Sequence, residues 1–355
     1  MTNDVVIVGV GMTTAVGLSA PETAASVRAG MMRFTETSLR DRHFDRFTIA
    51  EVTDEALESL AGPLDELAGL TAREARMLRL AAAPLRECLA PLAGRAVPIG
   101  LCLALPETET HCPLDRDAFV ERLAHQANAA FDPRRSDGSH VGRAGGLVAV
   151  GQAVSTIQRG ISEFMVAGGV DTFRDLYVLG TLDLEGRVKS RTNADGFVPG
   201  EGAAFVLLAS ERAAATFGLT PMARVSAAAV GFESGHLRSD QPYRGDGLAT
   251  TIAQLVRLGA IEEPIGDVYS SMNGESHWAK EWGVSHLRNR SLFRPDHGMH
   301  HPADCFGDTG AACGPLMIGL ASLGIRGSYR SAPALVYGSS DVGPRAALVV
   351  SAGRH

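Results

Sequence analysis

A glycine-rich segment, residues 139–169, constrains the fold of this chain more than any other part of the sequence. Its glycines at positions 142, 145, 146 and 151 permit tight turns and close backbone approach. Small and apolar residues then predict a buried helix from Gly145 to Arg159, followed by an apolar strand from Phe164 to Ala167. The first N–H groups of such a helix have no intrahelical partner, so this end can lower a thiol pKa or hold an oxyanion.

The cysteines are not placed to supply a nucleophile at this turn. Position 143 is an arginine, and no cysteine lies between Cys112 and Cys305. The five cysteines are odd in number and contain no C-x-x-C pair, so we predict neither a disulfide scaffold nor a metal site, and we expect buried reduced thiols. The segment has the architecture of a catalytic elbow without its nucleophile, and nothing in the sequence calls for a cofactor.

Composition limits the classes of partner. The 355 residues are 45% hydrophobic and 21% charged, which is typical of a well-buried α/β protein with two ordinary domains or one large two-part core. The net charge of −7 argues against nucleic acid and against an anionic membrane as partners. The chain has neither a basic amino-terminal region nor an apolar run of roughly eighteen residues, so we expect no signal peptide, no membrane span and a cytoplasmic location.

The remaining patterns predict alternating strands and helices in two halves. The first apolar strand, within residues 4–17, contains Gly9 and Gly11, but Thr14 replaces the third glycine of a dinucleotide-binding loop, so that interpretation is rejected. Residues 31–65 are polar and predict surface loops, and a long loop is expected after Gly169. Each half ends in a strand, a helix and a hairpin, which indicates a duplication with halves 1–220 and 221–355 in one compact unit. Further helices are expected at 21–30, 70–92 (with a kink or an end at Pro84), 115–130, 211–217, 246–259 and 304–323, and further strands at 97–105, 203–208, 224–232, 268–272, 334–337 and 346–351.

Three separated motifs resemble the β-ketoacyl synthases of the thiolase fold, in the correct order along the chain. Residues 165–169 are MVAGG, residues 195–203 are DGFVPGEGA, and residues 310–312 are GAA, the triplet that follows the second catalytic histidine of those enzymes. The resemblance covers almost the whole chain. It implies an α/β thiolase-like fold, with a duplicated five-layer αβαβα architecture, two mixed sheets and buried central helices, and it implies a homodimer.

The same alignment places unexpected residues at the family's catalytic positions. Counted back from Met165, the nucleophilic cysteine falls at Arg143. The first catalytic histidine falls at Asn273, the second at Gly307, and the supporting lysine near Pro302. Condensation needs a thiolate to carry the acyl group and N–H donors to stabilise the enolate, so the resemblance implies that ordinary condensing activity is lost.

Other polar residues near these positions are candidate substitutes or ligands. Glu275, His277 and His301 could form a rearranged acid–base group, although hydrogen bonding that only stabilises the loop explains Glu275 and His277 equally well. The turn that gates the family's pocket corresponds to residues 341–344. The predicted ligand-binding residues are Arg143, Asn273, Asp308 and Val342.

Simpler structural roles compete with these assignments. Arg143 at the positive end of a helix needs a nearby anion, and an internal ion pair with an Asp or Glu is favoured over a ligand site. Asp304 or Asp308 is expected to cap a helix. Trp278 and Trp282 lie four residues apart on one helical face, so they are expected to pack in the core or at an interface.

Three functions remain open on the sequence alone. The first is a non-condensing accessory protein that acts by binding. Its MNGE and PADC-x-GD segments resemble the small ketosynthase-like proteins encoded beside type VI secretion effectors, which implies that it loads or stabilises an effector. The second is a divergent acyltransferase, decarboxylase or hydrolase acting on acyl-CoA or acyl carrier protein thioesters. The third is an inactive partner subunit of a true ketosynthase. An enzyme needs an open tunnel ending at Arg143 and Asn273, whereas a binding protein can have it filled.

Overall fold

The computed structural model describes residues 4–107 and 114–353. The strands are β1 (Val5–Thr14), β2 (Thr35–Arg40), β3 (Arg46–Ile49), β4 (Gly100–Ala104), β5 (Asp137–Ser139), β6 (Phe164–Thr172), β7 (Glu201–Ser210), β8 (Ala223–Val225), β9 (Ala229–Phe232), β10 (Ile265–Ser270), β11 (Phe293–His300), β12 (Ala334–Ser339) and β13 (Pro344–Ser351). One long mixed sheet has the order β11-β10-β12-β13-β8-β1-β7-β6-β4-β5, with β9 paired to β13. The two predicted sheets are therefore joined, because β8 pairs with β1 on one side and with β13 on the other.

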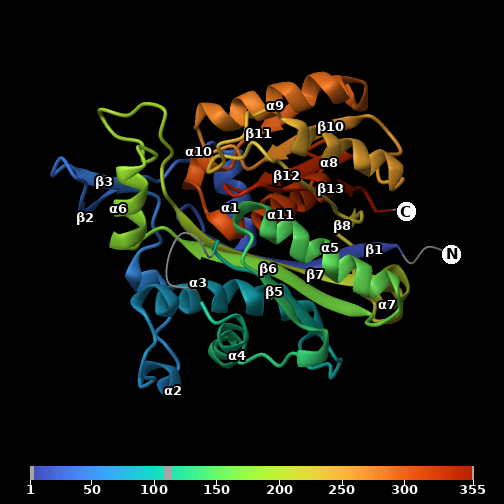
Figure 1. Ribbon diagram of the computed structural model, residues 1–355. Coiled ribbons are helices and arrows are strands. Elements are labelled where there is room, and N and C mark those ends of the chain that lie inside the picture. The colour runs from blue at the N-terminus through green and yellow to red at the C-terminus, as the bar shows by residue number, and fades with distance from the viewer. Residues whose placement is uncertain (1–3, 108–113, 354–355) are drawn as a thin grey trace.

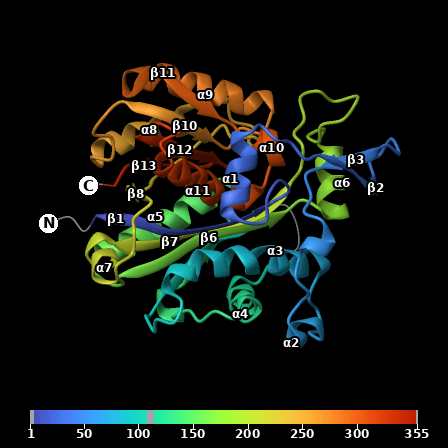
Figure 2. The same cartoon turned by 180° about the vertical axis from the view of Figure 1, so that it is seen from behind.

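Helices cover both outer faces of this sheet and fill the space between its two parts (Figures 1 and 2). They are α1 (Ala20–Arg28), α2 (Gly62–Asp65), α3 (Ala72–Leu89), α4 (Arg116–Ala127), α5 (Gly145–Gln158), α6 (Leu176–Leu184), α7 (Glu211–Thr216), α8 (Asp246–Arg257), α9 (Ser276–Asn289), α10 (Ala303–Phe306) and α11 (Cys313–Arg326). α3 packs on β1 and β7 with α4 against it, α8 packs on β13 with α9 against it, and α5 and α11 lie between the two parts. The predicted five layers with buried central helices are present.

Close packing at glycines explains why the central helices are buried. A Cβ added at Gly146 of α5 would lie 2.2 Å from Cδ of Pro315 in α11. A Cβ added at Gly11 of β1 would lie 1.9 Å from the carbonyl oxygen of Pro84 in α3. The buried helix predicted to begin at Gly145 is confirmed to within one residue. The glycines of β1 therefore serve helix–sheet packing.

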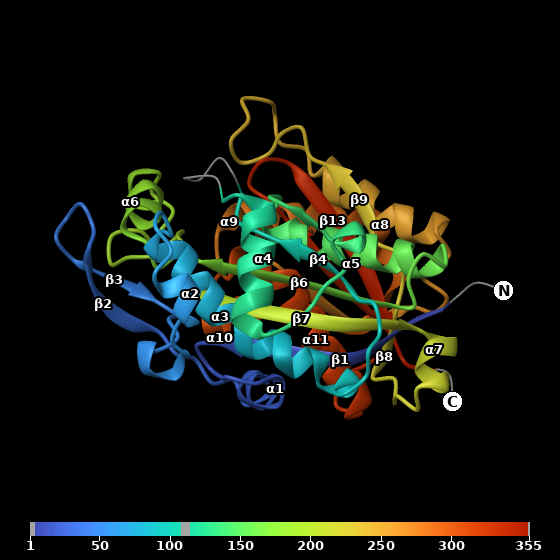
Figure 3. The ribbon, with the colours of Figure 1, turned by 90° about the horizontal axis from the view of Figure 1, so that it is seen from below.

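Two segments expected to be loops contain regular structure. Residues 31–65 hold the β2-β3 hairpin and α2, and the segment before β7 holds α6. The hairpin and α6 share a small apolar core and project from one end of the molecule (Figures 1 and 3). The prediction failed because β2 is a short polar strand and α6 lacks a polar face, so neither shows the periodicity that identifies an element.

Most of the longer helices follow the sequence, but α9 has no counterpart among the predicted helix ranges, and the single helix predicted over 304–323 is divided into α10 and α11. α3 passes through Pro84 without ending there, and Thr71 caps it as expected by accepting the N–H of Glu74 at 3.1 Å. β11 is not predicted, because it is half-exposed and contains Pro295, a residue that argues against a strand. Of the helices in the described residues, none is both long enough and apolar enough for a bilayer crossing.

Candidate functional site

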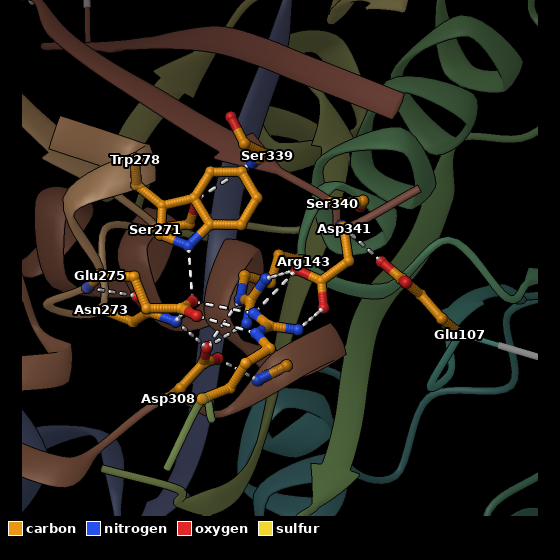
Figure 4. A network of polar contacts seen from close by, with 12 residues as sticks. Glu107, Arg143, Ser271, Asn273, Glu275, Trp278, Asp308, Ser339, Ser340 and Asp341 are labelled. Carbon is orange, nitrogen blue, oxygen red and sulfur yellow. Dashed lines mark hydrogen bonds and ion pairs between the residues drawn. The ribbon is translucent and has the colours of Figure 1, made fainter. Parts of the chain in front are cut away.

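Five charged side chains from distant parts of the chain meet at the N-terminal end of α5 (Figure 4). Arg143 lies in the turn that leads into α5, and Arg187 follows α6. Glu275 precedes α9, Asp308 lies between α10 and α11, and Asp341 follows β12. We call these five residues the Arg143 cluster.

Arg143 is held by two carboxylates. Its Nε donates to Oδ2 of Asp308 at 2.7 Å, and its Nη2 lies 2.6 Å from the same oxygen. Its Nη1 donates to Oδ1 of Asp341 at 2.5 Å. The guanidinium also lies over the ring of Trp278, 5.3 Å from the centroid, and the residue is only 4% exposed. The internal ion pair predicted for Arg143 is confirmed.

Arg187 closes the cluster from the other side. Its Nε donates to Oε1 of Glu275 and its Nη2 donates to Oε2 of Glu275, each at 2.8 Å, so the two side chains form a bidentate pair. Its Nη1 donates to Oδ2 of Asp341 at 2.5 Å, so Asp341 bridges the two arginines. Paired charge-assisted hydrogen bonds of this kind fix the relative orientation of both planar groups.

Two neutral donors complete the cluster. Nδ2 of Asn273 donates to Glu275 at 3.1 Å and to Asp308 at 2.8 Å. The indole N–H of Trp278 donates to Oε2 of Glu275 at 2.9 Å. The Asn273 amide, the group best suited to hold an oxyanion here, is therefore already bound to carboxylates.

The electrostatics of the cluster leave one excess negative charge, because three carboxylates face two guanidinium groups. Burial opposes the ionisation of Asp341, but the charges of Arg143 and Arg187 outweigh it and lower its pKa. Burial likewise opposes the charge of Arg143, yet the neighbouring carboxylates raise its pKa well above the usual value. Glu107 accepts the N–H of Asp341 at 3.1 Å, and burial together with the charge of Asp341 raises the pKa of Glu107 to about 8.

The cavity beside the cluster is very small. It touches Asp308 and Cys313 and has a volume of about 10 Å³. This is room for roughly one water molecule. The Sγ of Cys313 lies 3.4 Å from the carbonyl oxygen of Arg143, but burial raises the pKa of that thiol. An acyl thioester therefore meets neither an open channel at this cavity nor a thiolate beside it.

The structure brings together some predicted site residues and leaves others apart. Those in direct contact are Arg143, Asn273, Glu275 and Asp308. Pro302 precedes α10, Gly307 ends it with a φ of +69°, and Val342 follows Asp341 in a turn. In the described part of the chain, no side-chain hydrogen bond or ion pair joins Pro302, Gly307 or Val342 to the cluster.

The candidate substitute histidines do not complete an acid–base group. The ring of His277 packs against Tyr243 and Trp278, with centroids 4.6 and 4.8 Å apart, and burial lowers the pKa of His277. Nδ1 of His301 lies 2.8 Å from Oγ of Ser270. Within the described residues, neither His277 nor His301 hydrogen-bonds to a member of the Arg143 cluster, so the rearranged acid–base group is not assembled.

Sequence reasoning placed Asp341 in the turn that gates the pocket but did not predict its ion pairs, and it missed Arg187. Asp341 follows a buried strand, at a position where polar residues commonly form sites, and this signal was available. Arg187 carries no local signal, because only the fold brings it to Glu275 and Asp341.

The simpler structural predictions have mixed outcomes. The cap prediction is wrong for Asp304, which lies inside α10. Asp308 accepts the N–H of Gly310 at 2.9 Å, in the turn before α11, and so stabilises that turn without capping a helix. The packing role of the tryptophans is confirmed, since Trp278 is buried and Trp282 stacks on Tyr337 at 5.2 Å.

The described cysteines are free and buried, as expected. They are Cys88, Cys102, Cys305 and Cys313, whereas Cys112 lies outside the described residues. Among the described residues, no group of three or more His, Cys, Asp or Glu side chains is arranged to hold a metal ion.

Comparison with known proteins identifies the architecture. Residues 142–214 match the family "Beta-ketoacyl synthase, N-terminal domain". The ketosynthase from module 6 of the bacillaene synthase of Bacillus subtilis 168 superimposes with a TM-score of 0.81 and 12% identity, over 99% of this chain and 72% of that one. The fold is that of the ketosynthases. The ishigamide ketosynthase/chain length factor is similar over 100% of both chains, with a TM-score of 0.77 and 17% identity.

The likeness in sequence is confined to a short part of the ketosynthase-like fold. Polyketide synthase PksN of Bacillus subtilis (strain 168) is 40% identical over 75 residues. These residues are 19% of this chain and only 1% of that protein. The predicted thiolase-like fold is confirmed, and the chain is ketosynthase-like.

Proposed function

We propose that this chain is a non-condensing ketosynthase-like protein that acts by binding a protein partner. The observation that carries the proposal is Arg143. It occupies the turn at the N-terminal end of a buried helix, where the family's nucleophile is expected, and both sides of its guanidinium are bound to buried carboxylates. An arginine keeps its proton and cannot carry an acyl group.

The neighbouring groups do not replace the missing nucleophile. Cys313 contacts Arg143, but burial, and next the charge of Asp308, raise the pKa of its thiol, so the reactive thiolate is disfavoured. Both oxygens of Glu275 are bound by Arg187, and its Oε2 also accepts hydrogen bonds from Asn273 and Trp278, so this carboxylate is already engaged inside the cluster. These two contacts weigh against a divergent acyltransferase, decarboxylase or thioester hydrolase at this position.

The partner we propose first is a type VI secretion effector, which the chain would load or stabilise, in keeping with the short MNGE and PADC-x-GD segments. A second candidate is an inactive partner subunit of a true ketosynthase. The likeness in fold to the ishigamide ketosynthase/chain length factor over the whole length of both chains favours this second candidate. Either role uses the fold as a binding surface, and a homodimer is compatible with the first.

Intact-protein mass spectrometry tests the proposal. The chain is incubated with acyl-CoA, acyl carrier protein thioesters and malonyl thioesters, and thioester consumption is followed alongside. We expect no adduct and no turnover. A stable acyl mass increase traced to one cysteine would refute the proposal, and turnover without an adduct would establish a hydrolase or decarboxylase instead. Co-expression with a cysteine-bearing homologue, followed by size-exclusion chromatography, separates a heterodimeric subunit from an effector-binding homodimer.

A further inference from the structure

A second and larger cavity lies away from the Arg143 cluster and is lined in part by residues of α1, α10 and α11. These three helices lie near one another (Figures 2 and 3). The volume of the cavity is about 270 Å³. One wall is apolar and is formed by Ala24, Val27, Met299 and Leu320. A cavity of this size with an apolar wall is suited to a small organic molecule rather than to a bare ion.

Two arginines line this cavity, and their charges are not neutralised as those of the cluster are. Arg28 lies over the ring of Tyr329, with 4.5 Å between its Cζ and the centroid. Arg330 follows Tyr329 in the chain and also lines the cavity. Within the described residues, neither guanidinium forms an ion pair with a carboxylate. Asp267 is close enough to interact with Arg330, but it already binds His300 at 2.6 Å and accepts the N–H of residue 331 at 2.5 Å.

The polar wall beside the arginines is held rigidly. His300 is fixed by Asp267 and by its ring contact with Tyr269, at 4.7 Å between centroids. His301 is fixed by its hydrogen bond to Ser270. Both histidines line the cavity, and the carboxylate there belongs to Asp304, which is solvent-exposed. The side chains that line the cavity therefore include two guanidinium groups, two imidazole rings in fixed orientations and one exposed carboxylate.

We propose that this cavity binds an organic oxyanion, either a carboxylate or a phosphate monoester, that carries a compact apolar body. Guanidinium groups match the geometry of both oxyanions and form charge-assisted hydrogen bonds with them. The apolar wall takes the body of the ligand. The site is independent of the Arg143 cluster and of the proposed partner, so its failure would leave the proposed function unaffected.

Isothermal titration calorimetry of the full chain tests this site with phenyl phosphate, phenylacetate, inorganic phosphate and benzyl alcohol. We expect phenyl phosphate or phenylacetate to bind more tightly than inorganic phosphate, and the uncharged alcohol not to bind. The tighter of the two aromatic anions identifies the preferred oxyanion. The double variant Arg28→Gln with Arg330→Gln is expected to weaken binding at least about tenfold, because each arginine supplies charge-assisted hydrogen bonds. The matched control, Arg212→Gln, removes an exposed arginine on α7 and should leave binding unchanged.

A second variant separates the cavity from its charge. Val27→Trp fills the apolar wall but keeps both arginines, and it should abolish binding while thermal unfolding shows that the chain remains folded. The proposal is overturned if no anion binds the unmodified chain, if inorganic phosphate binds as tightly as both aromatic anions, or if the double arginine variant binds as the unmodified chain does.

Discussion

Replacing Arg143 with methionine should destabilise the fold strongly, and the structure shows which charge is responsible. The substitution keeps most of the side-chain volume but removes the countercharge of two buried carboxylates. Asp341 still has Arg187 at 2.5 Å, so it remains paired. Among the described residues, Asp308 retains only neutral donors, the amide of Asn273 and the N–H of Gly310. One uncompensated buried carboxylate costs about 3–5 kcal/mol, and we expect a loss of that size in the free energy of unfolding.

Equilibrium unfolding in urea, followed by circular dichroism, measures this loss. The control is Arg212→Met, which breaks an exposed ion pair with Glu163 and should change stability by less than about 1 kcal/mol. Adding Asp308→Asn to Arg143→Met removes the orphaned charge, so the double variant should be more stable than Arg143→Met alone. Our account of the cluster is wrong if Arg143→Met lies within about 1 kcal/mol of the unmodified chain, or if Asp308→Asn destabilises it further.

Three further predictions follow from the surroundings of the cluster. The pKa of Glu107 rises from 4.5 to about 8 on folding, so the unmodified chain should lose stability as the pH rises from 4.5 to 8, whereas Glu107→Gln should not lose it. Urea unfolding at these two pH values should show the variant gaining a few kcal/mol of stability relative to the unmodified chain. Gly310→Ala places a Cβ 2.0 Å from Oδ2 of Asp171 at a φ of +51°, and should lower the free energy of unfolding by at least about 2 kcal/mol. The control Gly180→Ala on α6 places its Cβ where no atom lies within 4 Å, and should raise the free energy of unfolding by about 0.5–1 kcal/mol. Trp278→Phe removes an indole donor to a carboxylate of the cluster and should cost about 1–3 kcal/mol by the same measurement.

The sequence predicts the layered part of the fold well, because burial there is written into local patterns. The central helix beginning at Gly145 and the capped helix after Thr71 appear where small residues and a cap indicate them. The hairpin β2-β3 and α6 are not predictable in this way. Their packing depends on contacts with each other, around Phe197, and neither has the alternation of polar and apolar residues that marks an element on its own.

The site is predictable only in part, for a similar reason. Arg143 and Asn273 are found because the family motifs fix their places, and the ion pair of Arg143 follows from the unfavourable position of a cation at a helix N-terminus. The identity of the anions does not follow. Asp341 and Arg187 lie 154 residues apart in the chain, and only the assembled sheet brings them to 2.5 Å.

The charges of the Arg143 cluster are segregated along the chain, and this bears on what the cluster does. Both arginines lie within residues 1–220, and all three carboxylates lie within residues 221–355. The two parts of the chain therefore cannot separate at this point without exposing opposite buried charges that were paired. We therefore expect a single cooperative unfolding transition, with circular dichroism and tryptophan fluorescence coincident, because Trp278 donates to Glu275 of the cluster and reports on this junction of the two parts. Fluorescence that changes at a lower urea concentration than circular dichroism would mean that the junction opens first, and that the cluster does not hold the two parts together.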